Sequence, residues 1–165
     1  SPKLNIRPFI YGGGQENGMR SGTENVGGIV ALGVATEVYR ARYDAQKVKA
    51  NREALINGLR SVPDVKIIAE NAPNTGLIVA FTALNTKAEI VQTLCAESGV
   101  IIGRGSACSS KHSGNRVLSV MGLPQKEIDG ALRIGLSPDT TPGEIETAIE
   151  TIRTSVERLR GGRIG

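Results

Sequence analysis

Hydrophobic residues recur at helical spacing in three segments of the chain. Residues 26–60 carry apolar positions three or four residues apart with charges between them, which predicts one long helix. The same spacing predicts a helix over residues 86–98, ended by Gly99, and a final helix over residues 142–160. In the final segment acids come early and arginines late, as the helix dipole favours.

Two of these segments begin with a pattern that favours the start of a helix. Thr86 and Glu89 have the spacing of a capping box, in which each side chain binds the backbone N–H of the other residue. Thr141 and Glu144 have the same spacing, with Pro142 at the first helical position, where a missing N–H costs no hydrogen bond. We therefore expect the two helices to begin at these threonines.

Short runs of apolar and β-branched residues predict the strands. Residues 65–69 and 77–81 are separated by a cluster of turn residues, so they are expected to form a hairpin or to be near neighbours. Residues 100–102 and 131–136 predict two further strands. The expected fold class is α+β, a small domain in which a sheet of few strands packs against helices.

Ahead of this pattern lie an arm and a glycine-rich loop. Residues 1–11 contain two prolines and predict an extended arm or an edge strand, because proline cannot donate to a sheet interior. In residues 12–25, glycines ahead of a helix could place backbone N–H groups and a hydroxyl around a phosphate. A connecting loop is an equally weighted alternative. Gly13 and Gly18 have the separation of a P-loop, but Met19-Arg20 stands where Lys-Ser/Thr is needed, and no G-x-G-x-x-G pattern is present.

Composition excludes several classes of protein. The 165 residues, 39% of them hydrophobic, suffice for one domain with a core, and no apolar stretch is long enough for a membrane span. The net charge of +4 is dispersed and aromatic residues are 3%, which argues against nucleic-acid binding. Two cysteines without a leader segment predict a reducing, cytoplasmic setting, and with one histidine they cannot build a four-ligand zinc site.

The candidate for chemistry is Cys108, in a polar loop that follows the apolar run at residues 100–102. Loops at strand ends often carry reactive groups, because the sheet fixes their position. Arg104, Lys111 and His112 lie near it in sequence, and positive charge lowers a thiol pKa and so raises the reactive thiolate fraction. From these residues alone, a nucleophile and a structural cysteine are equal alternatives.

Two other residues stand out within the predicted elements. Arg133 interrupts an apolar strand, where a guanidinium either meets an anion or faces solvent on the polar side of the strand. Cys95 lies four residues after Val91, on the apolar face of the predicted helix over residues 86–98, so we expect it in the core.

Three stretches resemble the pyridoxal-phosphate-dependent cysteine desulfurases of the class V aminotransferase family. They are Gly-Gly-Gly-Gln-Glu-Asn-Gly-Met-Arg-Ser-Gly-Thr-Glu-Asn at residues 12–25, Gly-Ser-Ala-Cys-Ser-Ser at 105–110 and Leu-Arg-Ile-Gly-Leu-Ser at 132–137. The resemblance implies the C-terminal part of a fold type I transferase. Residues 1–25 would be an arm and a cofactor loop of the large domain, and residues 26–165 the small domain with a long interdomain helix and the catalytic cysteine loop.

The resemblance also implies a role for each motif. Cys108 matches the nucleophile that attacks the sulfur of a cysteine substrate held by pyridoxal phosphate, which leaves alanine and a persulfide. Arg133 matches the arginine that binds the substrate carboxylate. Thr23 matches the threonine that reaches across a homodimer interface to the cofactor phosphate. Asn17 and Gly135 depart from an arginine and a serine usual in these motifs.

The implied function is a cysteine desulfurase that supplies persulfide sulfur to an acceptor or iron–sulfur scaffold protein, for cluster or thio-cofactor assembly. The family's Schiff-base lysine lies in a Ser-x-His-Lys context that no lysine here has, so we expect the isolated chain to be inactive. A module that accepts sulfur from a partner and passes it on without its own cofactor is the alternative. Selenocysteine is an alternative substrate to L-cysteine.

Overall fold

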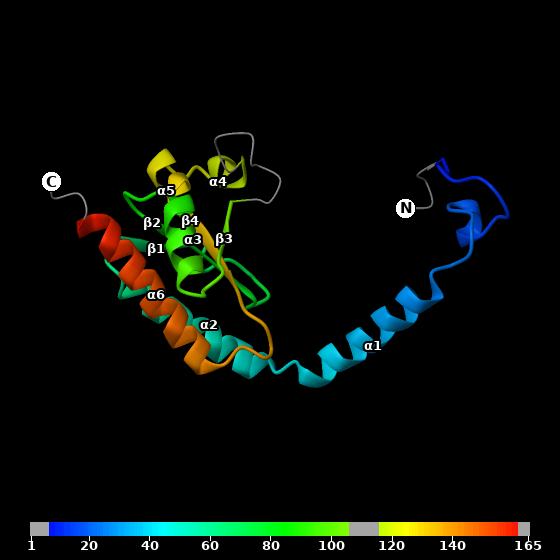
Figure 1. The fold of residues 1–165 in the computed structure, drawn as a ribbon, viewed down its shortest axis with the longest axis horizontal. Helices are drawn as coiled ribbons and strands as arrows, with labels where there is room; N and C mark the ends of the chain where they lie inside the picture. Colours follow the sequence, from blue (N-terminus) through cyan, green and yellow to red (C-terminus); the bar gives the residue numbers. More distant parts are fainter. Residues whose placement is uncertain (1–6, 106–115, 162–165) are drawn as a thin grey trace. The chain divides into compact units, whose positions relative to one another are not determined.

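A computed structural model describes residues 7–105 and 116–161. The chain divides into two compact units, Ser1–Tyr43 and Asp44–Gly165. The first unit contains a short 3-10 helix, η1 (Glu16–Gly18), and α1 (Val26–Arg42). All the strands of the described residues belong to the second unit (Figure 1).

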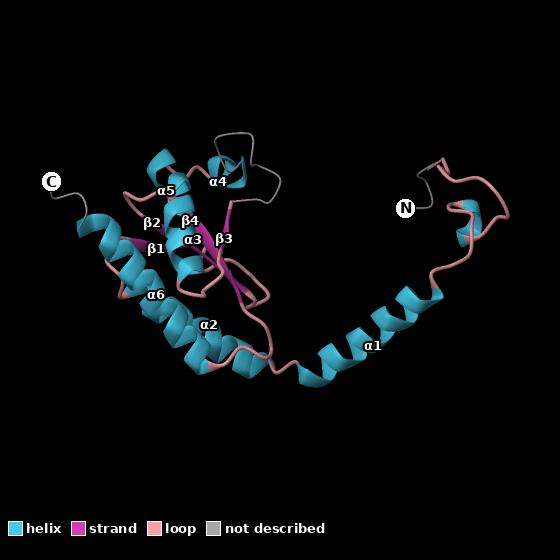
Figure 2. Ribbon diagram, viewed as in Figure 1, coloured by secondary structure: helices cyan, strands magenta, loops and turns pink. Residues whose placement is uncertain are grey.

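The second unit is built on a four-stranded antiparallel sheet (Figure 2). The strands are β1 (Val65–Ile68), β2 (Ile78–Ala83), β3 (Gly103–Arg104) and β4 (Ala131–Gly135), in the spatial order β1-β2-β4-β3. The hairpin predicted from residues 65–69 and 77–81 is confirmed, because β1 and β2 pair antiparallel. The strand predicted at residues 131–136 is also confirmed, and it occupies an interior position beside β2.

The strand predicted at residues 100–102 is wrong. This segment is irregular, with Ile102 buried and Ile101 82% exposed, and β3 begins only at Gly103. The reason is the end of the preceding helix, where Gly99 has φ +81° and the N–H of Val100 donates to the Cys95 carbonyl at 2.9 Å. Val100 therefore completes the helix cap instead of starting a strand.

Three helices pack against one face of the sheet: α2 (Ala45–Arg60), α3 (Ala88–Glu97) and α6 (Pro142–Gly161). The buried side chains between them include Leu55, Leu59, Val79, Phe81, Val91, Leu132, Ile134, Ile152 and Val156. The helices predicted over residues 86–98 and 142–160 are confirmed, and the apolar stripe of the second faces this core.

Two short helices cover part of the opposite face. They are α4 (Arg116–Val120) and α5 (Gln125–Asp129), which form a smaller apolar cluster with the sheet. The Thr82 hydroxyl donates to the Glu127 carbonyl at 2.7 Å, and a Cβ on Gly130 would lie 2.1 Å from the Ala83 carbonyl oxygen. This close approach requires glycine and holds α5 against the sheet.

The prediction of a single long helix over residues 26–60 is wrong, because the helix is interrupted at residues 43–44 and continues as a second helix. Tyr43 and Asp44 are extended, and the Asp44 carboxylate accepts from two backbone N–H groups of the next helix at 2.8 and 3.1 Å. Asp44 is thus an N-cap that starts a new helix. Apolar spacing continues across the break, so the helical period alone does not show it.

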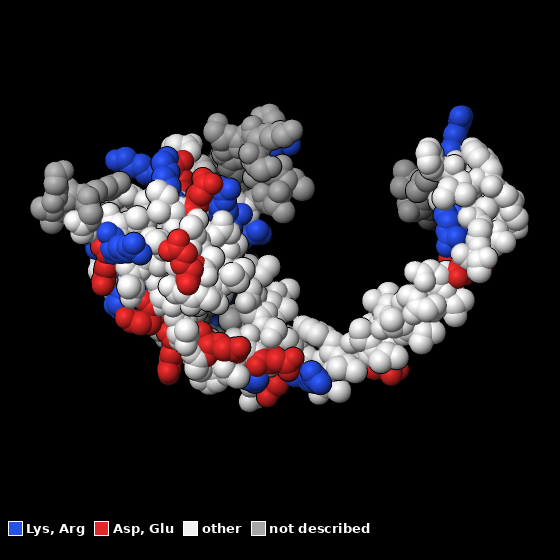
Figure 3. Space-filling model, viewed as in Figure 1, with Lys and Arg blue, Asp and Glu red and all other residues white. Residues whose placement is uncertain are grey.

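Helix α1 has no buried residue. Its exposed apolar side chains are Val26, Ile29, Val30, Leu32, Val34, Val38 and Tyr39. Its first charged residue is Glu37, and Figure 3 shows uncharged atoms over most of the helix. A helix that is apolar all round is normally buried, so α1 carries apolar surface that the first unit itself does not cover. Within the described residues, no helix is long and apolar enough to cross a membrane.

The two predicted capping boxes have different outcomes. At α6 the box is confirmed: the Thr141 N–H donates to the Glu144 carboxylate at 2.7 Å, and the Glu144 N–H donates to the Thr141 hydroxyl at 3.3 Å. At α3 it is wrong, because the Thr86 hydroxyl donates to the Ala83 carbonyl at 2.7 Å and no side chain caps the helix. Thr86 therefore closes the turn after β2 instead.

Thr141→Ala should lower the free energy of unfolding by about 1 kcal/mol. Hydrogen bonds from Thr141 hold the pKa of Glu144 below its ordinary value, so the contribution of the box is present above that ordinary pKa and is lost as the pH falls through the lowered one. Urea unfolding at pH 7 and in acid measures both effects. Thr147→Ala, in the same helix but outside the cap, is the control, and equal losses in the two variants would contradict the capping role.

Candidate functional site

Arg133 lies on the sheet face opposite the three packed helices. Its neighbours along β4, Leu132 and Ile134, point into the core, and successive side chains of a strand point to opposite faces. Arg133 is directly opposite Ala80 of β2 on one side and Gly103 of β3 on the other. Small residues therefore flank this exposed arginine on both neighbouring strands.

The guanidinium of Arg133 has no hydrogen-bond or ion-pair partner among the described residues. A Cβ on Gly103 would lie 3.8 Å from one of its terminal nitrogens, so the side chain extends over β3. A Cβ on Gly135, which follows Arg133 on the same face, would meet nothing within 4 Å. An anion could therefore reach the guanidinium donors without displacing a group of the described residues.

Cys108, Lys111 and His112 lie outside the described residues. The chain that leads to Cys108 is nevertheless tied to the sheet, because Gly103 pairs with Arg133 and precedes Cys108 by five residues. The β3–β4 pairing thus starts the cysteine loop beside Arg133.

Arg104, expected to contribute positive charge near Cys108, has an acidic partner. Its guanidinium lies 3.4 Å from the Glu89 carboxylate of α3. Both side chains are largely exposed, so the pair contributes little to stability. The Glu89 charge nevertheless offsets part of the positive field that the sequence alone assigned to Arg104.

Thr23 lies in the first unit, in the loop before α1. Its carbonyl accepts a hydrogen bond from Arg20 at 3.1 Å, while its N–H and hydroxyl have no partner among the described residues. Two free donors on an exposed turn fit a phosphate group. The described residues therefore fit pyridoxal phosphate at its phosphate end. Thr23 belongs to the first unit and Arg133 to the second, so each is described within its own unit.

The two departures from the family motifs are compatible with the local backbone. Asn17 has φ +55° and ψ +34°, a left-handed conformation that asparagine adopts more readily than arginine. Gly135 has open space where a side chain would stand. Neither substitution disturbs the turn before Thr23 or the face that carries Arg133.

Cys95 is confirmed as a core residue. It is fully buried on α3, and its Sγ lies 3.7 Å from the Ser155 hydroxyl oxygen of α6. Burial raises the pKa of the Cys95 thiol, so its reactive thiolate is disfavoured. Among the described residues, no three His, Cys, Asp or Glu side chains gather where they could hold a metal ion.

Cys95 should react with iodoacetamide at pH 8 on the order of a hundredfold more slowly in the folded chain than in urea, because burial removes both access and thiolate. Mass spectrometry of the Cys108→Ser variant, in which Cys95 is the remaining thiol, follows the reaction directly. Equal rates in buffer and in urea would show that Cys95 is not held in the core.

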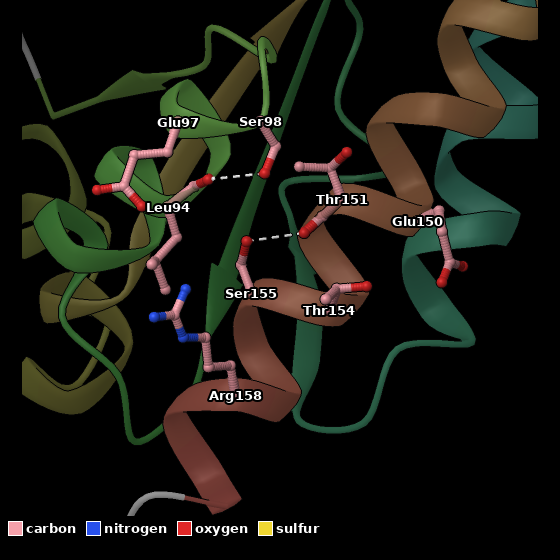
Figure 4. A pocket seen from close by; sticks show the side chains of 8 residues that line it. All are labelled: Leu94, Glu97, Ser98, Glu150, Thr151, Thr154, Ser155 and Arg158. Atoms are coloured by element: carbon pink, nitrogen blue, oxygen red, sulfur yellow. Dashed lines mark hydrogen bonds between the residues drawn. The ribbon is translucent and has the colours of Figure 1, made fainter.

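Two pockets of the second unit lie away from the predicted residues. One, of ≈ 190 Å³, lies between α3 and α6, where the hydroxyls of Ser98 and Ser155 each donate to the carbonyl four residues earlier (Figure 4). The other, of ≈ 730 Å³, lies between residues 99–102 and the start of α6. Neither of these two pockets is lined by Arg133 or Thr23.

The fold and the sequence together define a class. Residues 6–147 match the family described as aminotransferase class-V, and the chain belongs to this family. The resemblance drawn from the three motifs is thereby confirmed. The fold class is confirmed too, because a solved NifS-like protein from Rickettsia africae superposes with a TM-score of 0.80 at 30% identity, over 93% of this chain and 41% of that one.

Within the family, similar curated proteins include cysteine desulfurases. Cysteine desulfurase 2 of Trichormus variabilis is 36% identical over 163 residues, which are 95% of this chain and 40% of that protein. The cysteine desulfurase of Enterobacter agglomerans is 34% identical over 158 residues, which are 94% and 39%. The chain therefore spans about 40% of the length of the relatives that it matches.

Proposed function

We propose that this chain is the C-terminal part of a pyridoxal-phosphate-dependent cysteine desulfurase, which converts L-cysteine to L-alanine and captures the sulfur as a persulfide on Cys108. Arg133 carries the proposal. Its guanidinium is exposed and unpartnered within the described residues, on the strand that pairs with the start of the cysteine loop. Relatives named cysteine desulfurase match nearly the whole chain.

Arg133 binds the substrate in this proposal. A guanidinium presents two parallel N–H donors that match a carboxylate, and the pair fixes the orientation of the amino acid as well as its position. Ala80 and Gly103 beside it leave room for the substrate above the sheet. The substrate sulfur is then held at the side of the sheet from which the cysteine loop starts.

Cys108 performs the sulfur transfer. Its thiolate attacks the substrate sulfur, so that an S–S bond forms while the C–S bond breaks. The electron pair of the broken bond stays with the substrate carbon, which takes up a proton and becomes the methyl group of alanine. Pyridoxal phosphate, when bound, stabilises the negative charge that develops on the substrate carbons.

Thr23 holds the cofactor by its phosphate, through the hydroxyl and the backbone N–H. In this proposal the contact crosses a homodimer interface, and the Schiff-base lysine belongs to residues other than these. The persulfide of Cys108 then passes its outer sulfur to an acceptor or iron–sulfur scaffold protein in the cytoplasm.

A chimera tests the proposal. This chain replaces the matching 40% of the Trichormus variabilis desulfurase, and the product is loaded with pyridoxal phosphate. We expect alanine release from L-cysteine and a persulfide on Cys108, detected by mass spectrometry. A loaded chimera that forms no alanine, or that forms alanine without a persulfide on Cys108, would contradict the proposal. Sulfur acquired by Cys108 only from an external persulfide donor would favour the relay module instead.

A further inference from the structure

The peptide units around Gly22 and Thr23 are held by two side chains. One guanidinium nitrogen of Arg20 donates to the carbonyls of Gly22 and Thr23, each at 3.1 Å. The side-chain oxygen of Gln15 accepts from the N–H of Gly22 at 3.2 Å. Three backbone groups of this turn are therefore engaged, the N–H of Gly22 and the carbonyls of Gly22 and Thr23. The two donors of Thr23, its N–H and its hydroxyl, have no partner in the described part of the chain.

Arg20 is itself fixed at its backbone. It forms a β-bridge with Ile10, and the N–H of Ser21 donates to the Ile10 carbonyl at 3.2 Å. Ser21 is buried, whereas most of this loop is exposed. A second guanidinium nitrogen of Arg20 lies 4.0 Å from the Glu16 carboxylate. The backbone of Arg20 is thus fixed by its pairing with Ile10, and its side chain binds the carbonyls of Gly22 and Thr23.

The turn needs such support because its backbone can adopt several conformations. Gly22 has φ +106°, a region that residues with a Cβ rarely adopt and that glycine can leave at little cost. No helix or strand of the described residues includes Gly22 or Thr23. Without the two Arg20 hydrogen bonds, the turn would sample several conformations, and a ligand of Thr23 would have to select one of them.

We propose that Arg20 is a positioning residue, which fixes the turn so that the Thr23 N–H and hydroxyl are presented together to the cofactor phosphate. This inference rests on the proposed contact between Thr23 and that phosphate. Arg20 acts through the backbone, because one terminal nitrogen is shared by two carbonyls and the other faces Glu16. Its removal should therefore weaken phosphate binding only as long as Thr23 is present.

The experiment uses the full 165-residue chain, labelled with ¹⁵N and titrated in NMR spectra. Pyridoxamine 5′-phosphate is the probe, since it carries the phosphate but no aldehyde that would react with surface lysines, and pyridoxamine is the phosphate-free control. NMR detects millimolar affinities, so part of a binding site is sufficient. We expect the phosphate compound alone to shift the amide signals of Thr23 and its neighbours.

Arg20→Ala should weaken this binding about tenfold, with Arg20→Lys in between, because lysine keeps the charge but not the fixed geometry of the guanidinium. Arg40→Ala, at an exposed arginine of α1, should bind as the parent does. Thr23→Val removes the hydroxyl and keeps the side-chain shape. If Arg20 acts through Thr23, the double variant binds no more weakly than Thr23→Val alone.

Each outcome separates the two claims. Losses that add in the double variant would mean that Arg20 meets the phosphate directly, and would overturn the positioning role. Parent-like binding by Arg20→Ala, with loss in Thr23→Val, would also overturn it while leaving the Thr23 contact of the proposed function intact. No response in the parent, or no loss in Thr23→Val, would overturn the Thr23 contact and the inference with it.

Discussion

Replacing Cys108 by serine should lower alanine formation by the loaded chimera by about a thousandfold or more. A serine hydroxyl stays protonated at neutral pH and cannot form a persulfide, so the C–S bond of the substrate loses its acceptor. Binding of pyridoxal phosphate should stay unchanged, since Cys108 has no role in holding the cofactor. Alanine release and the absorbance of the bound cofactor measure the two effects separately.

Cys95→Ala is the matched control for this experiment. Cys95 is buried between α3 and α6, so its replacement should affect the packing of the core and leave the formation of a persulfide on Cys108 unchanged. A Cys108→Ser variant that retains a tenth or more of the parent rate would contradict the role of Cys108 as sulfur acceptor. Loss of activity in Cys95→Ala without loss of folding would contradict it as well.

Arg133→Ala should lower kcat/KM for L-cysteine about a hundredfold, equivalent to ~3 kcal/mol, mainly through a higher KM. The loss reflects a charge-assisted hydrogen-bonded pair with the substrate carboxylate. The free energy of unfolding should change by less than about 0.5 kcal/mol, since Arg133 is exposed and has no partner among the described residues. Steady-state kinetics and urea unfolding measure these two quantities.

Cysteamine, which is cysteine without the carboxylate, sharpens the Arg133 test. If Arg133 recognises the carboxylate, the parent and Arg133→Ala should turn over or bind cysteamine equally well. Arg158→Ala, at an exposed arginine of α6, should leave both compounds unaffected. A lower kcat with an unchanged KM for L-cysteine would count against substrate binding as the role of Arg133.

The sequence predicts the elements that have strong local patterns. The α6 stripe and its capping box follow from residues a few positions apart, and the β1–β2 hairpin follows from its turn cluster. The break at Asp44 is missed because apolar spacing continues across it, although aspartate is a common N-cap residue. Residues 100–102 are misassigned because Val100 is used to cap α3.

The candidate site depends on contacts that no local pattern encodes. The pairing of Gly103 with Arg133 is non-local, and β3 is two residues long, too short for the alternation that marks a strand. The hydrogen bonds from Arg20 to the turn at Thr23 join a side chain to backbone groups, which leaves no periodic signal in the sequence. The sequence shows that Arg133 is a charged residue in an apolar strand, but it does not show that Ala80 and Gly103 lie beside it.

The two-residue length of β3 has a consequence for how such a protein can change over evolutionary time. One short ladder ties the loop of Cys108 to the sheet before that loop ends at α4. The closure entropy of a segment that connects two elements rises slowly with its length, by only about 0.6 kcal/mol for each doubling. In the proposed function, insertions and deletions between β3 and α4 would therefore change the delivery of sulfur to a recipient, while the sheet that presents Arg133 would stay the same.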